Sequence, residues 1–170
     1  KLSTISWQEH IKNLKPLNET IFDRLKEVSN DLIFADSTGL ELSGEKFLTA
    51  SILFKNLLKK ELDTQNVGLL LPSTAAGAFI NYSILLMGKT AVNLNYTSEM
   101  ESIKQSIYSA QIKSVITSRK FVEKLELKGI NIKEFFDLVE IIYLEDLKEK
   151  IPKRKSLLTF LSVKFLPSFI

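Results

Sequence analysis

The sequence is poor in the residues that build metal, disulfide and phosphate sites. It has no cysteine, one histidine (His10), six glycines and four prolines among its 170 residues. Without cysteine the chain forms neither disulfides nor thiolate metal sites, which suits a reducing compartment. One histidine excludes a His-based metal cluster, and nothing near His10 orients it as a general base. No segment reaches the roughly 18–20 apolar residues that span a bilayer, and the N-terminus lacks a signal-peptide pattern.

The positive charge is also weak and dispersed. The net charge of +3 comes from 20 lysines and only 3 arginines, which are spread along the sequence. Nucleic-acid sites favour arginine and gather their charge on one face. We therefore do not expect a nucleic-acid partner.

What the sequence does contain is a regular series of apolar strands. They begin near Val67, Thr90, Ser114 and Val139, at intervals of 23, 24 and 25 residues, with helical sequence between them. Strands that alternate with helices indicate βαβ units and a parallel sheet. Because the strands are continuously apolar, both faces of the sheet should be covered. The sequence predicts an α/β fold, a three-layer, doubly wound, mainly parallel sheet with an N-terminal β-hairpin.

The chain divides into three parts. Residues 1–30 are a lead-in with one helix, and residues 31–149 form the α/β unit. Within it, "LIFADSTGLEL" (32–42) predicts a hairpin with its turn at Asp36-Ser37-Thr38-Gly39, and Ser43 then starts an amphipathic helix. Residues 150–170 open with a basic cluster and continue as an apolar run.

The connections carry recognisable end signals. The helix from Ala75 to Met87 should end at Gly88, a natural C-cap. Ser98-Glu99-Met100-Glu101 predicts a capping box for the next helix. Ser118 follows the third strand and is most simply the cap of the third helix. Asn95 follows the second strand and is suited to a left-handed turn.

The strongest local candidate for a site is Pro72-Ser73-Thr74, where a strand runs into a helix. Functionally, the N–H groups of Ala75 and Ala76 would face an anion or a substrate across a cleft. Structurally, Ser73 or Thr74 is an N-cap, and we favour this interpretation. The sequence has no G-x-S-x-G elbow and no phosphate-binding glycine loop, so no catalytic residue is assigned.

Two longer segments resemble the N-terminal part of the adenylate-forming (acyl-activating, AMP-binding) enzymes. "GLELSGEKFLTASILFKNLL" (39–58) looks like their opening hairpin and helix, with Gly44 in place of the usual aromatic residue. "VGLLLPSTAAGAFINYSILLMGKTAVNLNYT" (67–97) looks like their next strand, helix and strand, with Ser73 where asparagine is common.

"VITSRKFVEK" (115–124) and "IIYLEDL" (141–147) extend the similarity to one branch, the bifunctional 2-acylglycerophosphoethanolamine acyltransferase/acyl-acyl carrier protein synthetases. The resemblance implies acyl-adenylate formation from fatty acid and ATP with Mg²⁺. Transfer to acyl carrier protein and then to a lysophospholipid would follow. The resemblance also implies that the enzyme works at the cytoplasmic side of the inner membrane. It would be attached there peripherally or through another part of its chain, and this fragment itself would be soluble.

In that family, the phosphate loop, the nucleotide contacts and the catalytic lysine lie later in the chain. The resemblance therefore implies a fragment that is inactive alone, binds neither ATP nor Mg²⁺, has the rest of the ligase chain as its partner and forms one wall of the active cleft. Ser73, Thr74, Asn93 and Asn95 are the residues expected to face the substrate. The alternative is a stand-alone docking module, whose segment 150–170 lies on a membrane or a protein partner.

Overall fold

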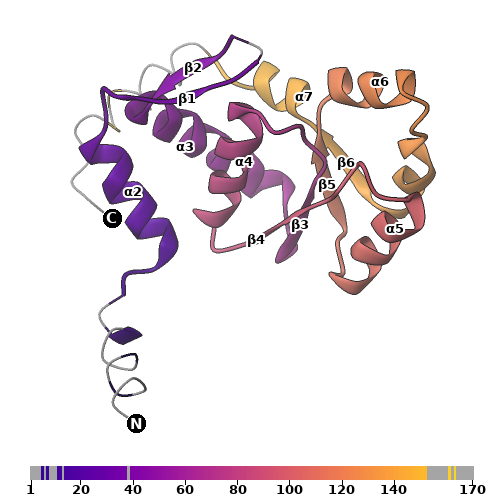
Figure 1. Ribbon diagram of the computed structural model, residues 1–170, viewed down its shortest axis with the longest axis horizontal. Coiled ribbons are helices and arrows are strands. Elements are labelled where there is room, and N and C mark those ends of the chain that lie inside the picture. Colours follow the sequence, from indigo (N-terminus) through magenta and orange to yellow (C-terminus); the bar gives the residue numbers. More distant parts are fainter. Residues whose placement is uncertain are drawn as a thin grey trace.

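The computed structural model describes residues 14–37 and 39–152, together with residues 5, 7, 11, 12, 161 and 163 (Figure 1). The described elements follow the predicted alternation of strands and helices. In chain order they are α2 (Leu17–Glu27), β1 (Leu32–Ala35), β2 (Glu41–Ser43), α3 (Gly44–Glu61), β3 (Asn66–Leu69), α4 (Ala75–Leu85), β4 (Thr90–Asn93), α5 (Met100–Ser109), β5 (Ser114–Thr117), α6 (Arg119–Leu127), the 3₁₀ helix η1 (Ile132–Leu138), β6 (Glu140–Tyr143) and α7 (Leu144–Glu149).

The four later strands form one parallel sheet in the order β4-β3-β5-β6. The chain therefore leaves β3 in one direction for β4 and then crosses back over β3 to reach β5. This reversal defines a doubly wound sheet, in which ligands bind beyond the carboxyl ends of the strands. Strands β1 and β2 form the separate antiparallel hairpin that the sequence predicted.

Each face of the sheet has its own hydrophobic core. Val67 and Ile116 face one core, where they pack with residues of α3 and α4 such as Leu58 and Ile80. Val115 faces the other core, which α5 and α6 cover. Figure 1 shows these two pairs of helices on opposite sides of the sheet. The predicted three-layer architecture is confirmed.

Three of the predicted helix ends are confirmed. The side chain of Ser43 accepts a hydrogen bond from Lys46 N at the start of α3, and Ser118 accepts one from Phe121 N at the start of α6. Gly88 follows α4 with φ +70°, a left-handed conformation that costs glycine little. Gly129 has φ +78° and lies in the same way after α6.

Other local predictions are wrong. Helix α5 begins after Glu99, which makes no side-chain capping hydrogen bond, so the capping box of Ser98 and Glu101 does not form. Asn95 is not left-handed, because Gln111 is the non-glycine residue with positive φ among those described. The predicted basic and apolar segment lies outside the described residues except for 150–152, 161 and 163.

Candidate functional site

A hollow of about 540 Å³ opens at the carboxyl ends of β3 and β4. We call it the strand-end hollow. The first turn of α4 and the hairpin close it on two sides. Its lining residues are Phe34, Ala35, Asp36, Leu71, Pro72, Ser73, Thr74, Ala75, Gly77, Ala78, Asn81, Asn93, Leu94, Asn95 and Tyr96.

The fold brings all four predicted site residues to this one hollow. Ser73 is exposed, whereas the Thr74 side chain turns back and accepts a hydrogen bond from Gly77 N at 3.4 Å. Thr74 is therefore the N-cap of α4, as favoured from the sequence. Asn95 Oδ1 accepts from the backbone N–H of Thr97 at 3.1 Å and from its hydroxyl at 2.7 Å. This Asx turn, rather than a left-handed conformation, shapes the rim.

Asn93 is held by a residue that the sequence reading missed. Asn81 projects from α4, and its side-chain amide pairs reciprocally with that of Asn93 on β4, at 3.0 and 3.2 Å. Asn81 Nδ2 also lies 3.3 Å from the carbonyl of Gly77. The sequence predicted that Asn81 lies on this helix. It did not indicate that Asn81 contacts Asn93, because the two residues meet only when the chain crosses over from β3 through α4 to β4. The pair gives the hollow an uncharged wall rich in donors and acceptors.

Of the two N–H groups predicted to face an anion, that of Ala75 is already used by the protein. Asp36 Oδ2 accepts a hydrogen bond from Ala75 N at 2.9 Å, so a carboxylate of the protein already occupies the N-terminus of this helix. This contact overturns the functional interpretation of Ala75 as an anion-binding group. Asp36 was predicted only as a turn residue, and its other oxygen does serve that turn, since it accepts from Leu40 N at 3.4 Å.

Backbone packing fixes the loop that precedes α4. A Cβ added at Gly77 would lie 2.8 Å from the carbonyl oxygen of Pro72, closer than a side chain tolerates. The first turn of α4 and the Pro72 loop therefore touch through their backbones. This contact sets the positions of Ser73 and Thr74 relative to the strand ends.

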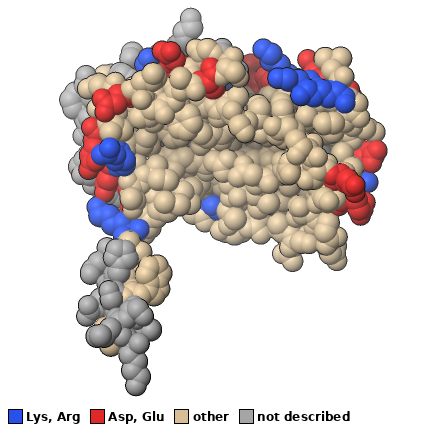
Figure 2. All heavy atoms as spheres, in the orientation of Figure 1, with Lys and Arg blue, Asp and Glu red and all other residues tan. Residues whose placement is uncertain are grey.

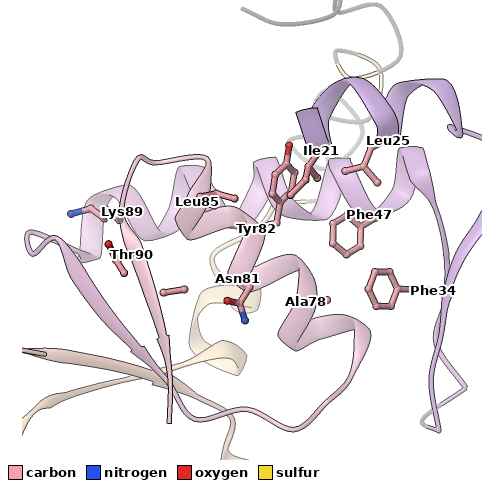
Figure 3. A pocket seen from close by; sticks show the side chains of 11 residues that line it. Ile21, Leu25, Phe34, Phe47, Ala78, Asn81, Tyr82, Leu85, Lys89 and Thr90 are labelled. Carbon is pink, nitrogen blue, oxygen red and sulfur yellow. The ribbon is translucent and has the colours of Figure 1, made fainter. Parts of the chain in front are cut away.

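A second, larger hollow of about 670 Å³ lies beside the first. We call it the apolar hollow; Figure 3 shows its lining side chains, which come from α2, the hairpin, α3, α4 and β4. It shares Phe34, Ala78 and Asn81 with the strand-end hollow, so the two are neighbours. Its other lining residues are Ile21, Leu25, Phe47, Tyr82, Leu85, Lys89, Thr90 and Ala91.

The polar groups of the apolar hollow have structural partners. Tyr82 donates its hydroxyl proton to the carbonyl of Asn18 at 2.8 Å, and its ring stacks on Phe47. Burial, aided by the negative charge of Asp23, raises the pKa of the Tyr82 hydroxyl well above its usual value. It therefore stays protonated at neutral pH. The ammonium group of Lys89 donates to the carbonyl of Thr64.

An ion pair lies just beyond the carboxyl ends of β5 and β6. Arg119 contacts both carboxylate oxygens of Asp146, at 2.6 and 2.8 Å, and its guanidinium lies 4.2 Å from the ring centre of Tyr143. The hydrogen bond from Arg119, together with its charge, lowers the pKa of Asp146 below its usual value. The strand-end hollow, by contrast, lies at the carboxyl ends of β3 and β4.

The described residues do not form a metal site. Within them, no three Asp, Glu or His side chains come close enough together to bind one ion. Nor is any helix in that part of the chain long and apolar enough to cross a membrane. Around the strand-end hollow, the described residues offer hydrogen-bonding amides and hydroxyls rather than a cluster of metal ligands.

Comparisons with solved structures show where this fold occurs, whereas no protein-family model matches the chain. o-Succinylbenzoate CoA synthetase (MenE) from Bacillus subtilis, in complex with the acyl-adenylate intermediate OSB-AMP, superposes with a TM-score of 0.64 at 15% identity, over 82% of this chain and 34% of that one. The anthranilate CoA ligase AuaEII, in complex with anthranoyl-AMP, gives 0.63 at 19% identity, over 83% and 29%. The N-terminal subdomain of Klebsiella oxytoca NpsA gives 0.63 at 10% identity, over 82% and 33%.

The chain therefore has the fold of part of the N-terminal subdomain of adenylate-forming enzymes. It spans about a third of the length of these structural neighbours. At these identities, the similarity shows the fold alone.

Proposed function

We propose that this chain is the first α/β subdomain of an adenylate-forming ligase and forms one wall of its active cleft. The observation that carries the proposal is the strand-end hollow. It lies at the open carboxyl edge of a doubly wound sheet, where such folds bind ligands, and the four expected residues all line it. The similarity of fold to enzymes that were solved with acyl- or aryl-adenylates supports the same interpretation.

In this proposal, the hollow contacts the substrate through neutral hydrogen-bonding groups. Asn93, held by Asn81, offers an amide to a substrate that sits over the strand ends, and Ser73 and Asn95 lie beside it. Thr74 acts by fixing the start of α4. By the resemblance of sequence segments, ATP and Mg²⁺ bind to parts of the enzyme that follow this subdomain.

The finer assignment rests on the resemblance of sequence segments. We infer that the acid is a fatty acid, that the acyl group passes to acyl carrier protein and then to a lysophospholipid, and that the enzyme works at the cytoplasmic side of the inner membrane. Residues 1–30 are then a lead-in, residues 31–149 the α/β subdomain, and residues 150–170 the passage to the rest of the ligase chain.

Acid-dependent ATP–pyrophosphate exchange tests the proposal in the full-length polypeptide from the source cells. We expect exchange with fatty acids, ATP and Mg²⁺, and none with the 170-residue chain alone. Asn93→Ala should raise the KM for the acid about fivefold, the effect of losing roughly 1 kcal/mol of hydrogen bonding.

The matched control is Asn131→Ala, which removes another exposed asparagine amide, one that is bonded to Glu134 and does not line the hollow. This variant should leave the KM unchanged. Equal effects of the two substitutions, or an Asn93→Ala variant that melts earlier with an unchanged KM, would rule out a substrate-facing role. Absence of exchange with every fatty or aromatic acid would refute the ligase itself.

A further inference from the structure

The loop between β3 and α4 (residues 70–74) forms one side of the strand-end hollow, and side chains tie it to the fold at both of its ends. At its start, the hydroxyl of Thr117 donates a hydrogen bond to Leu70 O at 2.8 Å. Just past its end, Asp36 Oδ2 accepts from the first N–H of α4 at 2.9 Å. The position of Ser73, which lies between these two points, therefore depends on contacts that are remote in sequence.

Thr117 acts where the backbone pairing of β3 stops. The last register pair between β3 and β5 joins Leu69 to Ile116, whereas β5 continues beside β6 as far as Thr117 and Tyr143. The side chain of Thr117 therefore reaches the carbonyl of Leu70 at the point where the chain leaves the sheet. Because both residues are fully buried, solvent cannot replace the hydroxyl, and this hydrogen bond fixes where the loop begins.

The hydrogen bonds within the loop are local among the described residues. Thr74 N donates to Pro72 O at 2.8 Å, and Gly77 N donates to the Thr74 hydroxyl at 3.4 Å. These bonds shape the turn into α4 but do not connect it to the sheet. The bond from Thr117 does connect them, because β5 lies next to β3, and β3 in turn pairs with β4, which carries Asn93.

The surroundings of the loop offer neutral groups rather than charges. Figure 2 shows lysine, arginine and acidic side chains mainly along the rim of the visible face and few in its middle. Among the described residues that line the strand-end hollow, Asp36 is the charged one, and its carboxylate already accepts from Ala75 N. Neutral hydrogen bonds weaken steeply when their angle changes, whereas charge–charge interactions fall off slowly with distance. A hollow of this kind therefore requires a loop that is held in place.

We propose that Thr117 is a positioning residue for the candidate site, which places Ser73 and Thr74 relative to Asn93 by holding Leu70 O. This inference rests on the proposed function, in which the strand-end hollow contacts the acid. Thr117 does not line the hollow itself, so its effect reaches the substrate through the loop. It should therefore act on the binding of the acid and leave the chemical step nearly unchanged.

The kinetics of acid-dependent ATP–pyrophosphate exchange in the full-length polypeptide test this role. Thr117→Val keeps the shape of the side chain and removes the hydroxyl. It should raise the KM for the acid about fivefold, the effect of losing one neutral hydrogen bond, and change kcat by less than about twofold. Thr117→Ser keeps the hydroxyl and should restore the wild-type KM. The matched control is Ser114→Ala, which removes a buried hydroxyl from the amino end of the same strand and should leave the KM unchanged.

Hydrogen exchange in the same polypeptide needs no substrate, so it separates this inference from the ligase proposal. In wild type, the amide of Leu70, which donates to Ile116 O at 2.9 Å, should be as protected as the amides within β3. In Thr117→Val it should exchange with solvent about tenfold faster, whereas in Thr117→Ser and Ser114→Ala it should keep the wild-type rate.

An unprotected Leu70 amide in wild type would overturn the proposal, even if Thr117→Val fails to fold. An unchanged KM in Thr117→Val, or an equal rise of the KM in Ser114→Ala, would overturn it as well. Absence of pyrophosphate exchange in wild type would refute the ligase, and the protection of the Leu70 amide would still decide whether Thr117 anchors the loop.

Discussion

Asp36 is the side chain whose replacement tests the geometry of the site most sharply. Its carboxylate joins the hairpin to helix α4, since one oxygen accepts from Leu40 N at 3.4 Å and the other from Ala75 N at 2.9 Å. Asp36→Ala removes both acceptors and the negative charge at the start of the helix. Asp36→Asn keeps an acceptor and removes only the charge.

The magnitudes follow from these two losses. Loss of a helix-capping side chain costs about 0.5–2 kcal/mol. A negative charge at a helix N-terminus contributes about 0.3–1 kcal/mol. We therefore expect Asp36→Ala to lower the free energy of unfolding by about 2 kcal/mol and Asp36→Asn by less than 1 kcal/mol. For a chain of this length, 2 kcal/mol corresponds to a fall in Tm of roughly 4–8 °C.

Urea denaturation followed by circular dichroism measures both values. The control is Ser37→Ala, a change at the exposed neighbour in the same turn, which should stay within about 0.5 kcal/mol of wild type. If Asp36→Ala is as stable as Ser37→Ala, the carboxylate does not hold the hairpin to the helix. If Asp36→Ala and Asp36→Asn are equal, the charge contributes nothing.

Three further predictions concern packing, the amide pair and pH. A Cβ at Gly44 would lie 2.5 Å from Val28 O and 2.6 Å from Leu25 O, so Gly44→Ala should cost about 1–3 kcal/mol in urea denaturation, and an unchanged stability would contradict this close approach. A double-mutant cycle of Asn81→Ala and Asn93→Ala should give a coupling energy of about 0.5–1 kcal/mol, whereas additive effects would show that the amides do not interact in solution. An NMR titration of Asp146 should give a pKa below the ordinary aspartate value, and Arg119→Gln should raise it toward that value. The pKa of Asp146 is lower in the folded state than in the unfolded state. The stabilisation by this pair is therefore present above the unfolded-state pKa and is lost as the pH falls through the folded-state pKa. An unchanged Asp146 pKa in Arg119→Gln would refute the pairing.

The sheet could be predicted because its signals are local. Each strand is a short, continuously apolar run, and the intervals between runs match a helical crossover. Ser43, Ser118 and Gly88 act within one turn of their own positions, so their roles could be identified from neighbouring residues. The carboxyl ends of parallel strands lie at the same end of the sheet, which is why Asn93 and Thr74 were expected to lie close together.

The missed features depend on contacts between distant segments. Asp36 has the sequence pattern of a turn residue, and nothing nearby indicates that Ala75, thirty-nine positions later, would donate to it. Asn81 lies on a mainly apolar helix, and its partner becomes visible only in the folded crossover. The capping box was predicted from a local pattern, and that prediction was wrong. Its residues match the pattern, but α5 begins at Met100, after both Ser98 and Glu99.

The size of the native polypeptide tests the central claim most directly. An antibody raised against this chain, used on extracts of the source cells, should detect a protein several times larger than 19.3 kDa, because the chain spans only about a third of its structural neighbours. Such a band would support a subdomain of an adenylate-forming enzyme. A single band at 19.3 kDa would contradict it.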